Sequence, residues 1–228
     1  MISPTGWPSR PRIQELSDLI FGLALSISAL TLIGQPPTSP QQFSFSLGLY
    51  GFSFLILIGL WRQYSSVTSI LPAETSVLVD LNVAILFLVS IEPYLFNELF
   101  SAREVMFVSI SMVYSMDLAA MFLILTFFLL SLTTDERHLV PSALLGRYRL
   151  VRNSTLVTAL IFILSIIPYF GNTVVWSSVS GSASYYISLR MVLWLLALGV
   201  TWGRRSLEYC GERKATRTDN PAPSALRS

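Results

Sequence analysis

The chain has 228 residues, of which 53% are hydrophobic and only 12% are charged, and its mean hydropathy is +0.62. Soluble globular proteins carry about 25% charged residues, so this chain has too little charge for a water-facing surface and is predicted to be a membrane protein. Its hydrophobicity excludes a disordered chain, its single cysteine, Cys210, excludes a disulfide scaffold, and a net charge of +2 is too small to indicate nucleic acid as a partner.

Six apolar stretches are each long enough to cross a bilayer as a helix, which takes about 20 residues. In chain order they cover residues 16–33, 43–61, 76–97, 105–131, 155–175 and 184–203. The connections between them are too short to hold a soluble domain. The sequence therefore predicts an all-α membrane protein with one six-helix transmembrane domain over residues 1–203. Residues 204–228 are polar and contain two prolines, so they are expected to form a disordered cytoplasmic tail.

Positive charge is distributed unevenly among the connections. Every Lys and Arg except Arg103 and Arg190 lies before the first stretch, between the second and third, between the fourth and fifth, or after the sixth. These segments share one side of the membrane in a six-helix topology. Because basic loops face the cytoplasm, both termini are predicted to be cytoplasmic.

Polar side chains gather at the inner ends of the first and third stretches. Asp18 and Asp80 lie near these ends, and Asn82 follows one short step further into the membrane. Arg12 precedes Asp18 on the same side of the bilayer. We expect these residues to form one inner polar cluster, because ionisable groups in a span face the protein interior or a wet path.

Three further ionisable residues lie deeper in the apolar stretches. Glu92 and Arg190 fall at a similar depth near the outer face and are expected to be partners. Asp117 lies near mid-membrane, where no basic residue matches its depth. The carboxylates either relay protons or cations, as in a transporter, or form hydrogen bonds between helices. The sequence leaves both interpretations open.

The chain does not carry the residues that an enzyme would need. His138 is the only histidine and Cys210 the only cysteine, so one chain cannot assemble a metal site or a Cys/His nucleophile. No Gly-rich phosphate loop or GxGxxG motif occurs. We predict no catalytic residue, no metal ligand and no cofactor.

The first predicted helix has a face that repeats at helical spacing. Leu23, Ser26, Ile27 and Leu30 follow the i, i+3, i+4, i+7 pattern, and small residues flank them. Small residues let helices approach closely. The pattern fits a helix inside a monomeric bundle, which the pattern alone favours, and also a helix packed around a symmetry axis.

The start of this helix carries a recognisable motif. Arg12-Ile-Gln-Glu-Leu16-Ser17-Asp18 resembles the Arg-x-x-x-Phe-Ser-Asp signature of the transmembrane-protein-175 family of potassium channels. Arg12, Ser17 and Asp18 match the signature, and Leu16 replaces its Phe. The following run from Phe21 to Ile27 is also similar to the family's first helix.

Three later positions extend the resemblance, and one departs from it. Trp61 stands at the cytoplasmic end of the second predicted helix, Asn82 lies early in the third, and Ser90-Ile-Glu-Pro-Tyr94 looks like the family's Ser-x-x-Pro-Phe. The family's His after the second-helix Trp is absent. Arg62, Gln63 and Tyr64 stand in its place.

The resemblance implies a potassium-permeable channel, built as a homotetramer in the lipid bilayer, without the selectivity loop of other potassium channels. In such a channel the first helices line the pore. Leu23, Ile27 and Leu30 would form apolar constriction rings, and Ser26 a hydroxyl layer between them. The signature residues Arg12, Leu16, Ser17 and Asp18 would be structural, supported by Trp61, Asp80 and Asn82.

The resemblance also bears on location and leaves rivals in place. A six-helix rather than twelve-helix chain indicates the plasma membrane of a prokaryote. Two other functions stay open: a proton-coupled small-solute transporter that uses the intramembrane carboxylates, and a non-transporting membrane subunit.

Overall fold

Long helices make up most of the chain. The computed structural model describes residues 12–34, 39–70, 76–101, 104–134, 142–180 and 183–218. Within these, the elements in chain order are α1 (Arg12–Gly34), α2 (Pro40–Thr68), α3 (Ser76–Ser101), α4 (Glu104–Thr133), α5 (Ser142–Ser165), α6 (Pro168–Asn172), β1 (Val174–Ser180), β2 (Ala183–Ser188) and α7 (Leu189–Thr218).

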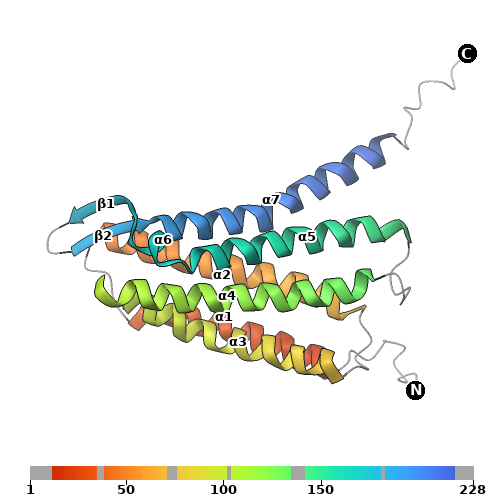
Figure 1. Cartoon of the computed structure of the whole chain (residues 1–228), viewed down its shortest axis with the longest axis horizontal. Coiled ribbons are helices and arrows are strands. Elements are labelled where there is room, and N and C mark those ends of the chain that lie inside the picture. Colours follow the sequence, from red (N-terminus) through yellow and green to blue (C-terminus); the bar gives the residue numbers. More distant parts are fainter. Residues whose placement is uncertain are drawn as a thin grey trace, which may run out of the picture.

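The long helices run side by side along the long axis of the molecule (Figure 1). α1 and α3 lie together on one side, α5 and α7 on the other, and α2 and α4 between them. A β-hairpin closes one end of the bundle, and the last part of α7 extends beyond the other end (Figure 1). This order places α1 at an edge of the bundle, where one of its faces has no neighbour among the described residues.

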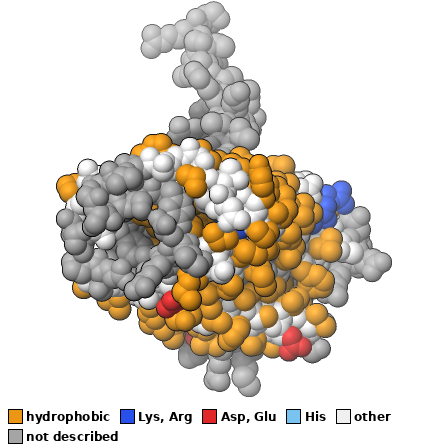
Figure 2. Space-filling view, turned by 60° about the vertical axis from the view of Figure 1, so that its left-hand side comes forward, with side chains coloured by type: hydrophobic (Ala, Val, Ile, Leu, Met, Phe, Trp, Pro, Cys, Tyr) orange, Lys and Arg blue, Asp and Glu red, His pale blue; other side chains and the backbone are white. Residues whose placement is uncertain are grey.

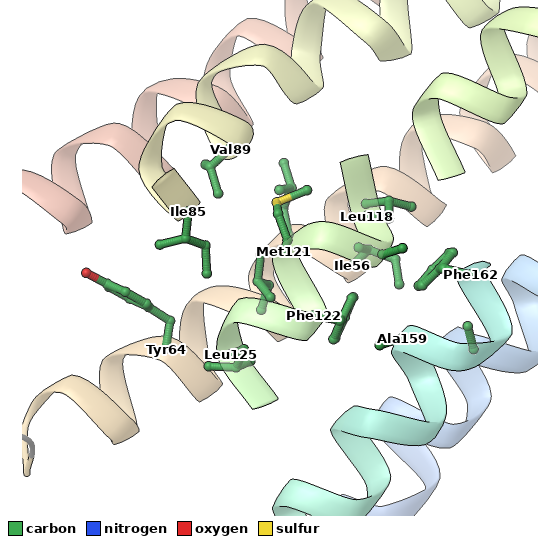
Figure 3. Packing of buried hydrophobic residues seen from close by; sticks show 14 of the residues in the cluster. Ile56, Tyr64, Ile85, Val89, Leu118, Met121, Phe122, Leu125, Ala159 and Phe162 are labelled. Carbon is green, nitrogen blue, oxygen red and sulfur yellow. The ribbon is translucent and has the colours of Figure 1, made fainter. Parts of the chain in front are cut away.

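The core centres on α4. Ile56 and Tyr64 of α2, Ile85 and Val89 of α3, and Ala159 and Phe162 of α5 converge on it, as Figure 3 shows. The rings of Phe122 and Phe162 stack with their centroids 5.7 Å apart. α4 is apolar on all sides, as expected for a central helix. In a membrane such packing stabilises by van der Waals contact rather than by release of water.

The outer surface is also apolar. Figure 2 shows hydrophobic side chains over most of the visible face, with few charged ones. Among the described residues, three helices are long and apolar enough to cross a membrane: Pro40–Thr68, Val77–Leu99 and Met106–Thr133. A shorter apolar helix covers Leu189–Gly203. These helices support the predicted integral membrane protein.

The chain departs from the predicted helices after Ser165. The first four predicted stretches all lie within helices, but the fifth helix ends at Ser165, ten residues before its predicted end at 175. Pro168 begins the short α6 at a position where its missing N–H costs nothing. The chain then forms an antiparallel hairpin in which Val174 pairs with Ser188 and Ser180 with Ala183. The hairpin was not predicted, and the rest of the described fold is helical as expected.

The last helix crosses the predicted domain boundary. α7 continues past residue 203 and ends at Thr218. Residues 219–228 lie outside the described residues. The division into a transmembrane domain over 1–203 and a polar tail over 204–228 stays a prediction.

Candidate pore-lining face and its polar anchors

The outward face of α1 carries a row of aliphatic side chains. Its members are between 42% and 75% exposed, and we call them the α1 stripe: Leu16, Leu19, Leu23, Ile27, Leu30 and Ile33. Ser26 is exposed beside them and donates a hydrogen bond to the carbonyl oxygen of Gly22 at 2.8 Å. The structure thus brings Leu23, Ser26, Ile27 and Leu30 onto one exposed face. Leu25 lies off this face and is half-buried.

The opposite face of α1 is buried against α2 and α3. Ser17, Phe21, Ala24 and Ser28 follow one another at steps of four, three and four residues, and each is at most 2% exposed. This is the spacing of one helix face. α1 therefore has one face fixed to its own chain and one that the chain leaves open.

At the inner end, α1 is tied to α2 and α3 by hydrogen bonds. Trp61 Nε1 donates to Asp18 Oδ1 at 2.9 Å. The hydroxyls of Ser17 and Tyr64 are 2.7 Å apart, and Tyr64 donates in turn to Asn82 Oδ1. We call these five residues the inner anchor. Each contact joins two different helices, so the group fixes the depth of α1 against its neighbours.

The predicted inner cluster is present in part. Trp61 and Asn82 do support Ser17 and Asp18, as the resemblance implied. Asp80 is instead exposed on α3, and no hydrogen bond joins it to the anchor among the residues that the structure describes. Arg12 begins α1, but its side chain lies outside the described part.

The sequence-based interpretation missed Tyr64, the centre of this anchor. Tyr64 is fully buried and contacts both α1 and α3. It comes three residues after Trp61, which places the two on one face of α2. The three-residue spacing from Trp61, in the segment where the family's His is absent, was the signal that could have identified Tyr64.

A second set of hydrogen bonds lies further along α1. Glu92 of α3 is fully buried, and its carboxylate accepts from Ser53 of α2 at 2.7 Å and from Tyr114 of α4 at 2.9 Å. Ser28 of α1 donates to its other oxygen at 3.4 Å. We call these four residues the outer anchor. They join four helices at one carboxylate.

Asp117 lies one helical turn from Tyr114 on α4. It is only 6% exposed, and its Oδ2 atom has no hydrogen-bond partner in the described part of the chain. No basic residue at its depth was predicted. A buried polar atom without a partner is rare and calls for a functional or structural reason.

Arg190 does not pair with Glu92 as predicted. Its Nε donates to the carbonyl oxygen of Ser165 at 2.7 Å, and its Nη1 to the carbonyl of Val108 at 2.8 Å and to Ser111 Oγ. Nη2 donates to the carbonyl of Ile167 at 3.3 Å. The side chain thus binds the carbonyl end of α5 and the first turns of α4. Equal depth in the membrane was insufficient evidence for a pair, because it does not say which way each side chain faces around its helix.

Gly171 makes room for this arginine. A Cβ atom at Gly171 would lie 2.7 to 2.9 Å from three atoms of the Arg190 guanidinium. Real Cβ atoms do not approach that closely, so any other residue at this position would force the guanidinium to shift from its hydrogen bonds.

The residues that the structure describes form no group of three or more His, Cys, Asp or Glu that could hold a metal ion. The most distinctive surface is the α1 stripe, an aliphatic row with one hydroxyl beside it. Such a row offers no general base and no nucleophile. It can pack against a second copy or line a narrow path.

Comparison with known proteins identifies relatives of this arrangement. The family described as endosomal/lysosomal potassium channel TMEM175 matches residues 12–93, which contain both the signature and Glu92. No curated protein matches the sequence. One similar solved structure is described as the crystal structure of a lysosomal potassium-selective channel TMEM175 homolog from Chamaesiphon minutus.

That structure shares the fold at low sequence identity. The TM-score is 0.54 at 16% identity, with 84% of this chain and 95% of that chain covered. The likeness therefore extends beyond α3 to most of the bundle. The match over residues 12–93 supports the resemblance of the first helix to the TMEM175 family, and the solved structure shows that the chain shares the fold of a TMEM175 homolog.

Proposed function

We propose that this chain is the subunit of a homotetrameric, potassium-permeable channel whose pore is lined by α1. The observation that carries the proposal is the α1 stripe: an apolar face at an edge of the bundle, on a helix whose other face is anchored by polar contacts. A single chain gives this face nothing to enclose. Four copies around an axis would bring four such faces together, and closed cyclic assemblies are the common way to achieve this.

The membrane arrangement follows from the same proposal. α1, α2, α3, α4, α5 and the first part of α7 would be the six spans, with both termini in the cytoplasm and the hairpin on the outer side. The charge distribution supports this orientation. The plasma membrane of a prokaryote is the expected location, and residues 204–228 would face the cytoplasm.

The pore would contain constriction rings instead of a selectivity loop. In a tetramer, Leu23, Ile27 and Leu30 would each supply four aliphatic side chains, and Ser26 four hydroxyls between them. An ion that passes an apolar ring loses contacts with water and gains little in return. Such rings can also close a pore by expelling water from it.

Mass measurement and ion flux test the proposal. The purified protein is expected to be a tetramer in detergent, and vesicles that contain it should pass potassium faster than sodium under matched gradients. Empty vesicles are the control. A stable monomer without flux would instead indicate a non-transporting membrane subunit.

The buried Asp117 favours a second candidate, a proton-coupled transporter. Ionisable residues inside a membrane domain commonly belong to a proton or ion path, and Asp117 has an oxygen without a partner. Replacement Asp117→Asn keeps the shape and removes the titratable group. Transport that depends on a proton gradient and is lost in Asp117→Asn would favour the transporter, whereas unchanged potassium flux would favour the channel.

A further inference from the structure

α1 is held at two points, one on the inner side of the proposed constriction and one within it, between Ile27 and Leu30. The inner anchor holds Ser17, and the outer anchor contacts Ser28. The two serines are eleven residues apart in the sequence, which is about 16 Å along a helix. Leu23 and Ile27 of the α1 stripe lie between them on the opposite face. The two anchors therefore set where these side chains face.

The outer anchor depends on one side chain. Glu92 of α3 is fully buried and is bound by hydroxyls from α1, α2 and α4. Three hydroxyls, each from a different helix, thus meet at this one carboxylate. A change at Glu92 would thus alter the relation of α1 to three helices together.

The three bonds to Glu92 are unequal. Those from Ser53 and Tyr114 measure 2.7 and 2.9 Å, typical of strong O–H···O bonds, whereas the bond from Ser28 measures 3.4 Å. We call α2, α3 and α4 the frame; at Glu92 the hydroxyls of α2 and α4 lie closer to the carboxylate than the hydroxyl of α1 does. Of the three bonds to Glu92, a small rotation or slide of α1 would change only the one from Ser28.

We propose that Glu92 is a positioning residue for permeation: through Ser28 it sets the rotation and depth of α1, and so the aim of Ile27 and Leu30 at the pore axis. Ser28 follows Ile27 directly in the chain and faces the frame while Ile27 faces outward. Any turn of the helix at Ser28 moves Ile27 by the same angle. This inference rests on the proposed function, in which α1 lines the pore.

A matched pair of serine variants tests the proposal. Ser28→Ala and Ser53→Ala each remove one hydroxyl from Glu92, but Ser28 belongs to α1 and Ser53 to the frame. Ser28→Ala should lower the potassium-to-sodium permeability ratio roughly twofold or more with little change in melting temperature, because its bond is long. Ser53→Ala should lower the melting temperature and leave the ratio near that of the wild type. Equal ratios in the two variants would overturn the proposal.

Two variants of Glu92 itself separate the loss of its hydrogen bonds from the loss of its charge. Glu92→Gln keeps an acceptor for Ser53 and Tyr114 and can still bond to Ser28, so its permeability ratio should stay close to that of the wild type. Glu92→Leu removes all three bonds and should lower the ratio. If Glu92→Leu does not fold, Ser28→Ala and Glu92→Gln decide the question. A lower ratio in Glu92→Gln than in Ser28→Ala would contradict a positioning role and indicate that the charge itself acts on ions.

A distance measurement separates this proposal from the proposed function. Spin labels at Ile33→Cys on α1 and Leu130→Cys on α4, in a Cys210→Ser background diluted with unlabelled chains, report the place of α1 within one subunit. Both sites are exposed. Ser28→Ala should shift or broaden this distance, and Ser53→Ala should not. An unchanged distance in Ser28→Ala would overturn the positioning role of Glu92. A wild-type protein that fails to conduct potassium would overturn the proposed channel, but it would not affect the distance measurement.

Discussion

The contacts between helices are arranged differently in the first three helices and in the rest of the bundle. α1, α2 and α3 are joined by directional hydrogen bonds at the two anchors. α4, α5 and α7 are joined by aromatic packing, such as Phe122 on Phe162 and Tyr114 on Trp194, with ring centroids 5.7 and 5.3 Å apart. Hydrogen bonds from Arg190 and Trp194 join the same helices. Hydrogen bonds fix the rotation and depth of a helix, whereas apolar packing supplies contact area. The two anchors fix the rotation of α1, whose stripe would face the partner subunits in the proposed channel, and the family match covers this same part of the chain.

The comparison predicts that variants in the C-terminal part change stability and leave permeation alone. The largest expected effect is that of Arg190→Met. It removes the donor from one buried and two part-buried carbonyl groups and from the buried Ser111, and each unsatisfied buried acceptor costs about 1–3 kcal/mol. The free energy of unfolding in detergent should fall by about 3–5 kcal/mol.

The exposed Arg62 provides the control for this variant. Arg62→Met removes the same charge and should change stability by only about 0.5 kcal/mol. The Arg190→Met protein that remains folded should keep its potassium-to-sodium permeability ratio. A changed ratio would show that the C-terminal part also shapes the ion path. It would then no longer differ from the N-terminal part in this respect.

The next effect concerns the N-terminal part. Tyr64→Phe removes the hydroxyl that joins Ser17 to Asn82 and leaves both buried groups without this partner. We expect a loss of about 2 kcal/mol in unfolding free energy. Unlike Arg190→Met, this variant should also alter potassium flux, since it releases the inner end of α1. Tyr50→Phe, on the same helix but half-buried, is the matched control and should change neither quantity.

A pair of glycine variants should give effects of opposite sign. Gly171→Ala places a Cβ atom within 2.9 Å of the Arg190 guanidinium, and overpacking of this kind costs about 1–3 kcal/mol. Gly199→Ala in α7 meets no atom within 4 Å and should stabilise by up to about 1 kcal/mol, because alanine favours the helix. Thermal unfolding of the two proteins beside the wild type measures both. Equal melting temperatures would contradict the tight fit around Arg190.

The smallest effect on stability, and the sharpest on flux, is expected on the α1 stripe. Ile27→Asn wets the proposed constriction and should raise conductance and weaken discrimination against sodium. Leu25→Asn places the same side chain off the stripe and should leave permeation unchanged. Single-channel recordings of both variants compare them directly. If only Leu25→Asn changed permeation, α1 would be rotated from the proposed placement; if neither did, α1 would not line the pore.

Most of the helical architecture could be predicted, because long apolar runs determine where membrane helices form. That Leu23, Ile27 and Leu30 share one face of α1 also followed from spacing, since they repeat with the helix; spacing alone did not predict that this face is exposed. The hairpin was missed because Val174, Val175 and Trp176 read as the end of an apolar span. Their β-branched and aromatic character, followed by Ser180-Gly181-Ser182, was the available strand and turn signal.

Contacts between helices were harder to predict than the helices themselves. Glu92 and Arg190 were predicted to pair because they lie at a similar depth. In the structure, Glu92 accepts hydrogen bonds from three hydroxyls, and Arg190 donates to backbone carbonyls. Depth is read from position in a span, whereas direction depends on how the helices pack. Trp61 and Asn82 lie at the inner anchor, and the signal for them was the family motif rather than depth in the membrane.

The surroundings of Arg190 also determine how its charge acts at a distance. The carbonyl oxygens of Val108, Ser165 and Ile167 turn the negative ends of their dipoles toward the guanidinium, much as water molecules turn toward a dissolved cation. The protein thereby provides this arginine with a fixed solvation shell, which lowers its electrostatic potential outside the shell. A cation that approaches the far side of the bundle, along α1, would meet little repulsion from it. A buried positive charge can thus hold four elements together without opposing the entry of potassium.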